Sequence, residues 1–274
     1  ITINFLWNMK RSKTNTGFLF LIEKIVRSHP LLYFIIRQFI RYTNIFEEDA
    51  NGVVFLNFNK KVNIIDVGAS DGISAKFFNN KLKVNKIICF EPNKSYAKTL
   101  RKLNIDNLIV NEYGIGQFNK YHKIFFPRYK FLSKNLDLVT YSYYNKQSLK
   151  NRINLDFKFK KNITIVESKI YLKKIKKTDA RIDLIKIDVN GHESSVVKGL
   201  AHIIKRDKPV LIIETGDDIK IIERFLKKYG FDKYLFLKEY NKFVKIKKKY
   251  PLNTYFLQKN HLKLRVTWIK FDIW

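Results

Sequence analysis

The chain has 274 residues, is 46% hydrophobic and carries a formal net charge of +30. A chain of this length can bury about 70% or more of its unfolded surface in one core, so a second large domain is unnecessary. Cys89 is the only cysteine, which excludes a disulfide framework and a cysteine-based zinc site. The apolar stretches 17–22 and 31–36 are too short to cross a bilayer, and we expect a cytoplasmic protein.

The positive charge would ordinarily indicate a polyanionic partner such as nucleic acid, an acidic glycan or an anionic membrane. However, lysines greatly outnumber arginines and are spread through the chain beside abundant Asn, Ile, Phe and Tyr. That pattern is typical of a genome-wide compositional bias. We therefore do not favour a nucleic-acid partner, and a dedicated anion-binding face stays an alternative.

Residues 1–60 predict a helical extension that caps the core. Apolar residues recur at helical spacing through 18–26, and Pro30 suits the first turn of a second helix whose apolar stripe runs through 32–40. A cap packed on the sheet is our prediction. The alternative is a basic amphipathic foot, residues 18–41, that lies on the inner surface of a membrane.

From residue 62 onward, short apolar runs alternate with amphipathic helices, a pattern typical of βαβ units. We predict a Rossmann-like α/β domain over 61–259, with a mostly parallel seven-stranded sheet, helices on both faces, and a tail at 260–274. The expected strands are 62–67, 86–90, 107–111, 182–188, 209–214, 231–237 and 253–258. The expected helices are 73–80, 95–103, 192–205 and 217–229.

Residues 117–170 interrupt this alternation. The segment holds an extended run at 121–126, a stretch rich in Tyr and Asn, and a second extended run at 162–172. Long insertions in compact domains are usually functional or disordered. We therefore expect this one to recognise the substrate.

The first motif is Asn63-Ile-Ile-Asp-Val-Gly-Ala-Ser-Asp-Gly72, a strand that runs into a glycine loop and a helix. Such a strand end is where open α/β sheets bind ligands. A dinucleotide loop needs Gly-x-Gly-x-x-Gly around a pyrophosphate, whereas this loop has Gly-x-x-x-Gly spacing and acids that would repel phosphate. S-adenosylmethionine has no phosphate; acids can accept from its ammonium, and backbone N–H groups can receive its carboxylate. We predict this cofactor, held by Asp66, Gly68, Ala69, Ser70, Asp71 and Gly72; a purely structural turn is the alternative.

The second motif places Glu91 directly after the predicted strand 86–90. A carboxylate at that position can accept hydrogen bonds from both ribose hydroxyls of an adenosyl group. Pro92 ends the strand, and Asn93 can turn the chain into the next helix. We predict cofactor contacts from Glu91, Pro92 and Asn93.

The third motif, Ile182-Asp-Leu-Ile-Lys-Ile-Asp-Val-Asn-Gly-His-Glu193, is a buried strand that ends in polar residues. Asp188, at the strand end, and His192, chosen because imidazole is the side chain best suited to proton transfer near neutral pH, are our candidates for a base or hydrogen-bond acceptor, with Glu193 orienting its neighbour. Helix capping and dipole compensation are the alternative for His192 and Glu193.

Two further expectations concern this strand and the next one along the chain. Asp183 and Lys186 lie within it and should form structural pairs. The oxygens of Asp188, Asn190 and Glu214 would suit magnesium, but we do not favour a metal at this position.

The three ordered motifs, IIDVGASDG, CFEPN and IDLIKIDVNGHE, resemble the FkbM family of methyltransferases over about residues 45–258. The resemblance implies a class I methyltransferase fold, S-adenosylmethionine as the donor, and O-methylation of a sugar hydroxyl in a bacterial glycan or a secondary metabolite. It also implies that Gly114 passes beside the adenine. The family's third motif usually reads Asp-Val-Glu-Gly, and Asn190 replaces that Glu here, which puts a role of that carboxylate as base or metal ligand in doubt.

Two other functions are weighed against this one. Tyr141, Tyr143 and Tyr144 among basic residues would suit stacking on a single-stranded nucleic acid. Base-modifying amino methyltransferases, however, usually carry Asp/Asn-Pro-Pro-Tyr/Phe where this chain has Asp188-Val-Asn-Gly. A non-catalytic scaffold bound to membranes through 18–41 would have no use for the acids Asp66 and Glu91. The predicted partner is therefore a small-molecule or glycan acceptor.

Overall fold

The computed structural model describes residues 29, 31–32, 35, 48–58, 60–138, 141–157, 160–175, 178–247 and 250–262. Most of the predicted helical cap and most of the tail lie outside these residues. The chain divides into two compact units. The described residues of 1–48 and 121–170 form the first unit, and those of 49–120 and 171–274 form the second.

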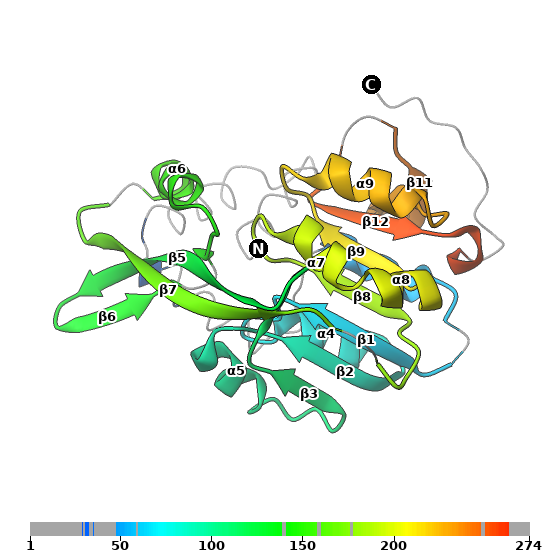
Figure 1. Ribbon diagram of the computed structural model, residues 1–274, viewed down its shortest axis with the longest axis horizontal. Helices are drawn as coiled ribbons and strands as arrows, with labels where there is room; N and C mark the ends of the chain where they lie inside the picture. The colour runs from blue at the N-terminus through cyan, green and yellow to red at the C-terminus, as the bar shows by residue number, and fades with distance from the viewer. Residues whose placement is uncertain are drawn as a thin grey trace. The chain divides into compact units, whose positions relative to one another are not determined.

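The second unit contains an eight-stranded mixed sheet with the strand order β11-β10-β12-β9-β8-β1-β2-β3 (Figure 1). Its strands are β1 (Val62–Val67), β2 (Val84–Phe90), β3 (Leu108–Asn111), β8 (Leu184–Ile187), β9 (Val210–Glu214), β10 (Asp232–Leu237), β11 (Lys242–Lys245) and β12 (Asn253–Leu257). The pairs from β9 to β3 are parallel, whereas β12 is antiparallel to β9 and β10, and β11 is antiparallel to β10. The prediction of seven strands is wrong by one, because the short edge strand β11 adds an eighth.

The helices of this unit follow the expected order with one difference. They are α4 (Ile73–Lys81), α5 (Lys94–Leu100), α7 (Glu193–Gly199), α8 (Ala201–Asp207) and α9 (Ile219–Lys227), with the 3-10 turns η2 (Glu48–Phe55), η4 (Lys238–Tyr240) and η5 (Lys259–His261). Figure 1 shows α7 and α8 in front of the sheet and α4 behind it. The single helix predicted at 192–205 is two helices, since Leu200 both ends α7 and precedes α8.

The core lies on the central parallel strands. Every residue of β1 and β8 is buried, as expected when helices cover both faces of a sheet. Side chains from α7 and α8 pack on these strands in one apolar cluster, which includes Ile65, Ile185, Ile187, Val196, Leu200, Ile203 and Ile204. This packing fixes the positions at which the strands end and the motif loops begin.

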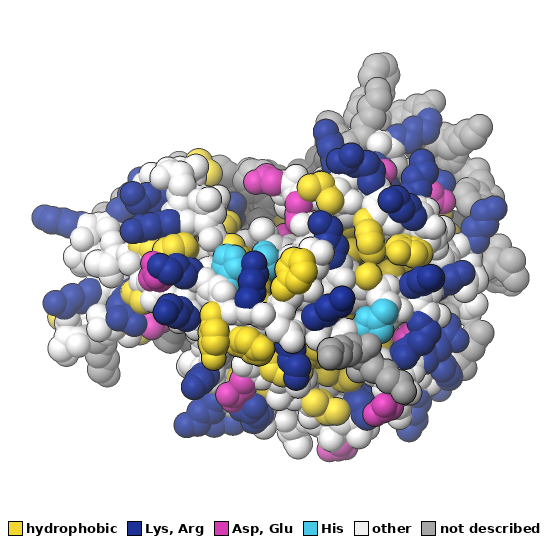
Figure 2. Space-filling view, viewed as in Figure 1, with side chains coloured by type: hydrophobic (Ala, Val, Ile, Leu, Met, Phe, Trp, Pro, Cys, Tyr) yellow, Lys and Arg dark blue, Asp and Glu magenta, His cyan; other side chains and the backbone are white. Residues whose placement is uncertain are grey.

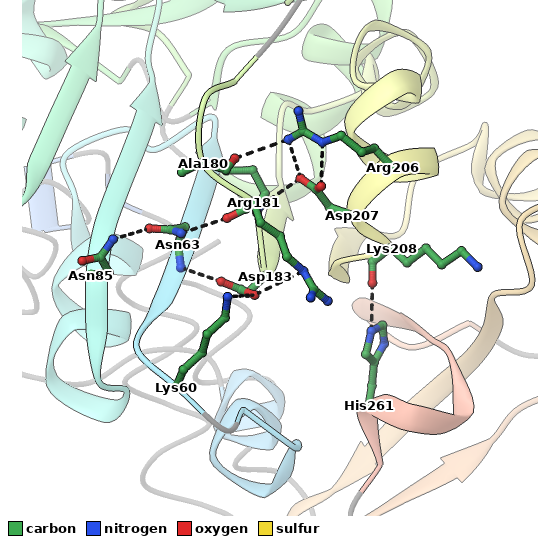
Figure 3. A network of polar contacts seen from close by, with 11 residues as sticks. Lys60, Asn63, Asn85, Ala180, Arg181, Asp183, Arg206, Asp207, Lys208 and His261 are labelled. Carbon is green, nitrogen blue, oxygen red and sulfur yellow. Dashed lines mark hydrogen bonds and ion pairs between the residues drawn. The ribbon is translucent and has the colours of Figure 1, made fainter.

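A polar network holds the amino ends of β1 and β8 together (Figure 3). The backbone N–H of Asn63 donates to Asp183 Oδ2 at 3.0 Å, and the Asn63 amide donates to the carbonyl of Arg181 at 2.8 Å. Asp207 accepts the backbone N–H of Ile182 at 2.9 Å, and the adjacent Arg206 lowers the pKa of Asp207 against the opposing effect of burial. Asp183 therefore has a structural role, as expected. It lies at the amino ends of β1 and β8, whereas the motif loops follow the carboxyl ends of these strands.

The first unit contains the strands β5 (Lys120–Phe131), β6 (Lys134–Asp137) and β7 (Ile163–Lys173) and the helix α6 (Lys146–Asp156). With β4 (Gly114–Ile115), these strands form a sheet in the order β4-β7-β5-β6. The unit has a small apolar core of its own, made of Leu138, Tyr141, Leu149, Ile153 and Phe157.

The chain leaves and rejoins the second unit at one place. The backbone N–H of Lys174 donates to Asn119 Oδ1 at 2.8 Å, and that of Gly116 donates to the carbonyl of Lys173 at 3.2 Å. The two ends of the insertion are therefore tied directly to each other.

Candidate cofactor and catalytic site

The glycine loop after β1 is a tight turn with three residues in left-handed backbone conformations, Gly68 (φ 79°), Ser70 (φ 51°) and Gly72 (φ 87°). A Cβ on Gly68 would stand 1.9 Å from the carbonyl oxygen of Asp188, and one on Gly72 would stand 2.4 Å from Leu103. Both positions therefore require glycine. The loop brings the carboxyl ends of β1 and β8, and so the first and third motifs, into direct contact.

Glu91 ties the loops after β1 and β2 together. Its Oε2 accepts the backbone N–H of Ser70, and its Oε1 accepts that of Asn93, each at 2.8 Å. Burial raises the pKa of Glu91 to about 7, against the opposing effect of these two hydrogen bonds. Since each carboxylate oxygen can accept two hydrogen bonds, each keeps one acceptor position for a ligand hydroxyl.

Asp66 lies deeper than the sequence suggests. It has no exposed surface, and its Oδ2 accepts the hydroxyl of Ser74 in the first turn of α4. Burial raises the pKa of Asp66, and its Oδ1 has no hydrogen-bond partner among the described residues. The structure gives Asp66 a part in holding α4 in place; its predicted contact with a cofactor ammonium stays a prediction.

The other predicted cofactor residues lie around the same strand ends. Ala69 and Asp71 are buried in the glycine loop. Asn93 caps α5, with its side-chain oxygen accepting the N–H groups of the second and third residues after it. Pro92 lies 3.8 Å from where a Cβ on Gly114 would be, so the structure brings the second motif and the predicted adenine strand together.

Asp188 forms a buried ion pair. Lys186 Nζ lies 2.9 Å from Asp188 Oδ2, and both side chains are nearly fully buried. Burial alone would raise the pKa of Asp188, but the Lys186 ammonium and a hydrogen bond from Glu214 lower it. Burial and the Asp188 carboxylate raise the pKa of Glu214 well above its ordinary value. The two pKa values are thus shifted in opposite directions, which makes Asp188 the stronger acid of the pair.

The carboxylate of Glu193 is hydrogen-bonded to the loop that precedes it. Its carboxylate accepts the backbone N–H of Val189 at 3.2 Å and that of Gly191 at 3.0 Å, and the side chain is 1% exposed. Burial raises the pKa of Glu193 to about 7. These bonds join residues of the loop before α7 and not the first turn of the helix, so Glu193 shapes the turn that presents His192 at the start of α7.

Asn190 and Gly191 form the outer part of this turn, both in left-handed conformations (φ 55° and 99°). Asn adopts that conformation more readily than most residues with a Cβ. A Cβ on Gly191 would meet nothing within 4 Å. Asn190, at the position where the family motif usually has Glu, therefore lies in a left-handed turn conformation that Asn tolerates better than Glu does.

Sequence reasoning missed two supporting residues. Ser74 donates to Asp66, and Asp218 accepts the backbone N–H of Ser194 at 2.7 Å. Glu214, which the sequence had already placed at a strand end beside Asp188, forms a hydrogen bond with Asp188. Periodicity does not reveal the contacts of Ser74 and Asp218, because it does not show which groups meet after folding.

Three further observations concern metal ligands, membrane spans and surface charge. Within the described ranges, no group of three or more His, Cys, Asp or Glu side chains is arranged to hold a metal ion. No helix among the described residues is long and apolar enough to span a membrane. Lys and Arg side chains are spread across the face seen in Figure 2, the distribution expected from a compositional bias.

An open α/β sheet with a glycine loop after β1, an acid after β2 and a polar turn after β8 defines a Rossmann-like protein with a ligand site at its strand ends. The chain belongs to the FkbM methyltransferase family: the family model described as "Methyltransferase FkbM domain" matches residues 66–233. The resemblance inferred from the three motifs is confirmed.

Solved structures similar to the chain include three methyltransferases. The FkbM methyltransferase of Methylobacillus flagellatus KT is 18% identical over 74% of this chain and 45% of its own, with a TM-score of 0.44. A precorrin-6y C5,15-methyltransferase of Geobacter metallireducens GS-15 is 14% identical over 78% of this chain and 89% of its own, with a TM-score of 0.37. TrmK of M. capricolum, in complex with S-adenosylhomocysteine, is 12% identical over 79% of this chain and 70% of its own, with a TM-score of 0.36. The chain thus spans less than half the length of the first of these structures. No curated protein matches the sequence.

Proposed function

We propose that the protein transfers a methyl group from S-adenosylmethionine to a hydroxyl of a sugar, in a glycan or a secondary metabolite. The observation that carries the proposal is the Glu91 carboxylate, which joins the loops after β1 and β2 while keeping one acceptor position on each oxygen. Two adjacent hydroxyls of a ribose match those two positions.

The other residues at these strand ends fit the same donor. Asp66, Asp71 and Glu91 surround the glycine loop with acid, which disfavours a pyrophosphate and suits an ammonium. Pro92 and Gly114 meet beside this loop, where the adenine is expected. When bound, the donor supplies an electrophilic methyl carbon on a sulfonium.

The protein's part is to position the acceptor oxygen and to take its proton. Alignment of reacting atoms provides much of the catalysis in a displacement of this kind. His192 is the candidate base, because Asp188 is held ionised by Lys186 and is therefore a weak base. Asp188 is the candidate hydrogen-bond acceptor that orients the hydroxyl or the imidazole. We propose that the insertion 117–170 selects the acceptor.

Calorimetric titration of the whole chain with S-adenosylmethionine and S-adenosylhomocysteine tests the donor site. We expect both to bind and Glu91→Gln to weaken binding about tenfold or more, because the amide replaces one acceptor oxygen with a donor. Glu112→Gln is the matched control, since Glu112 directly follows β3 as Glu91 follows β2 but pairs with Arg101 at the surface. Glu112→Gln should leave the affinity unchanged.

Other outcomes would overturn parts of the proposal. If the folded protein bound neither compound, the methyltransferase function would be lost and the non-catalytic scaffold would remain. If it bound the donor but methylated RNA in preference to sugar hydroxyls, with S-adenosylhomocysteine release as the measurement, the acceptor would be wrong.

A further inference from the structure

The hairpin of β5 and β6 ends in an exposed apolar turn. Leu132 is 82% exposed and Phe131 is 39% exposed. Phe131 pairs with Lys134, so Leu132 and Ser133 form a two-residue turn between the strands. Neither apolar side chain belongs to the core cluster of this unit. Phe131 stacks on the ring of Tyr129, with 6.4 Å between the ring centroids, whereas Leu132 is largely exposed.

Leu132 also has a backbone conformation that does not suit a leucine. Its φ is 51°, in the left-handed region, where a Cβ is strained and where hairpin turns favour Gly or Asn. Glycine at this position would relieve the strain and remove an exposed apolar side chain. Folding alone thus gives no reason for a leucine here.

Exposed lysines surround this turn. Lys130 precedes it on β5, and Lys160 and Lys161 lie in the turn before β7. The two segments are adjacent, because the backbone N–H of Lys130 donates to the carbonyl of Asn162 at 2.9 Å. The acids that border these segments, Asp137, Asp156 and Glu167, pair with Arg128, Arg152 and Lys123. The apolar turn is therefore flanked by three lysines whose nearest acids in sequence are engaged with other cations.

We propose that this tip, defined as Phe131 and Leu132 with Lys130, Lys160 and Lys161, docks on the surface of an anionic lipid membrane. The apolar pair would enter the boundary between headgroups and acyl chains, and the lysines would contact lipid phosphates. A nucleic acid would also attract the lysines, but it would give Leu132 no apolar environment. The exposed leucine is what favours lipid, and the inference is independent of the donor site.

Flotation of the whole chain with lipid vesicles tests this proposal. We compare vesicles of phosphatidylcholine alone with vesicles of phosphatidylcholine and phosphatidylglycerol in equal parts. Binding is expected to the anionic vesicles, and Leu132→Gly should weaken it about tenfold, the effect of withdrawing one buried leucine side chain. Replacing Lys160 and Lys161 with Gln should weaken it by roughly fivefold for each lysine.

Two controls separate docking from folding. Leu155→Ala removes a leucine that is 80% exposed on α6 and should leave vesicle binding unchanged. The urea midpoint of Leu132→Gly should equal or exceed that of the wild type, because the substitution relieves strain. Absence of binding to anionic vesicles would overturn the proposal. So would binding that survives Leu132→Gly but is competed by single-stranded RNA, which would assign the lysines to nucleic acid.

Discussion

A Cβ on Gly68 would stand 1.9 Å from the carbonyl oxygen of Asp188, so the backbones at the ends of β1 and β8 touch with no room for a side chain. Gly68 is therefore the position at which the first and third motifs are held together. Any residue other than glycine must separate the two strand ends or move one of the loops.

Gly68→Ala is expected to lower the free energy of unfolding by about 3 kcal/mol or more, because it combines a backbone clash with a left-handed φ. Gly191→Ala is the matched control: its φ is 99°, but a Cβ there meets nothing within 4 Å. It should cost about 1 to 2 kcal/mol, the strain alone. Urea unfolding measures both, and equal costs would contradict the contact with Asp188.

Lys186→Met should destabilise the protein by about 3 to 5 kcal/mol, because it leaves the buried Asp188 carboxylate without its cation. The exposed pair of Arg101 and Glu112 provides the comparison, and Arg101→Met should cost less than about 1 kcal/mol. Chemical denaturation at neutral pH measures the difference. A small loss for Lys186→Met would mean that Asp188 is not ionised in the folded state.

Glu214→Gln should be nearly neutral for stability at pH 7. An amide can donate to Asp188 as the protonated Glu214 does, so the hydrogen bond is kept. Asp188→Asn, in contrast, leaves Lys186 as an unpaired buried charge and should be strongly destabilising. Reversal of this order in urea unfolding would mean that Glu214 carries the charge.

Stability should fall as the pH rises through neutrality. Burial raises the pKa of Glu91 and of Glu193 to about 7 from the ordinary value of 4.5. Between these values the folded state binds more protons than the unfolded state, so the contribution is complete below the unfolded pKa and is lost as the pH passes 7. Each group contributes up to about 3 kcal/mol. Glu193→Gln should flatten the dependence measured by urea unfolding from pH 5 to 8, and an unchanged slope would contradict the raised pKa.

His192→Ala is expected to lower kcat about a hundredfold while S-adenosylhomocysteine binding stays near the wild-type affinity, because the histidine acts on the acceptor and not on the donor. Full turnover in His192→Ala would exclude the histidine as base. Asp188→Asn would then be examined, with its loss of stability measured in parallel.

The sequence predicted the strands that precede the motifs well, because buried parallel strands are short, continuous apolar runs bounded by glycine or proline residues. β11 was missed because it has only two buried residues, Phe243 and Val244, between lysines. The break at Leu200 was missed because the apolar periodicity continues across it. Neither the strand β11 nor the break at Leu200 can be recognised from the local amino-acid composition.

The positions of the three motifs on the sheet were predicted better than the contacts that their side chains make. Glycine spacing and acids at strand ends correctly placed the three motifs at one edge of the sheet. The sequence could not predict that the carboxylate of Glu91 accepts the backbone N–H of Ser70, or that the carboxylate of Glu193 accepts that of Gly191. These hydrogen bonds depend on where backbone N–H groups point after folding. Sequence patterns identify carboxylates without showing which of them are already satisfied.

The hydrogen bond from Lys174 to Asn119 has a consequence for how such a protein can diversify. Because the two ends of the inserted segment are joined at its base, a replacement of any length can be grafted there without changing the distance that the chain must span. The entropy of closing such a graft grows only slowly with its length. Relatives could therefore exchange this module while inheriting the sheet and its strand-end motifs intact, and a chimera made by swapping residues 120–173 would test the proposal that the segment selects the acceptor.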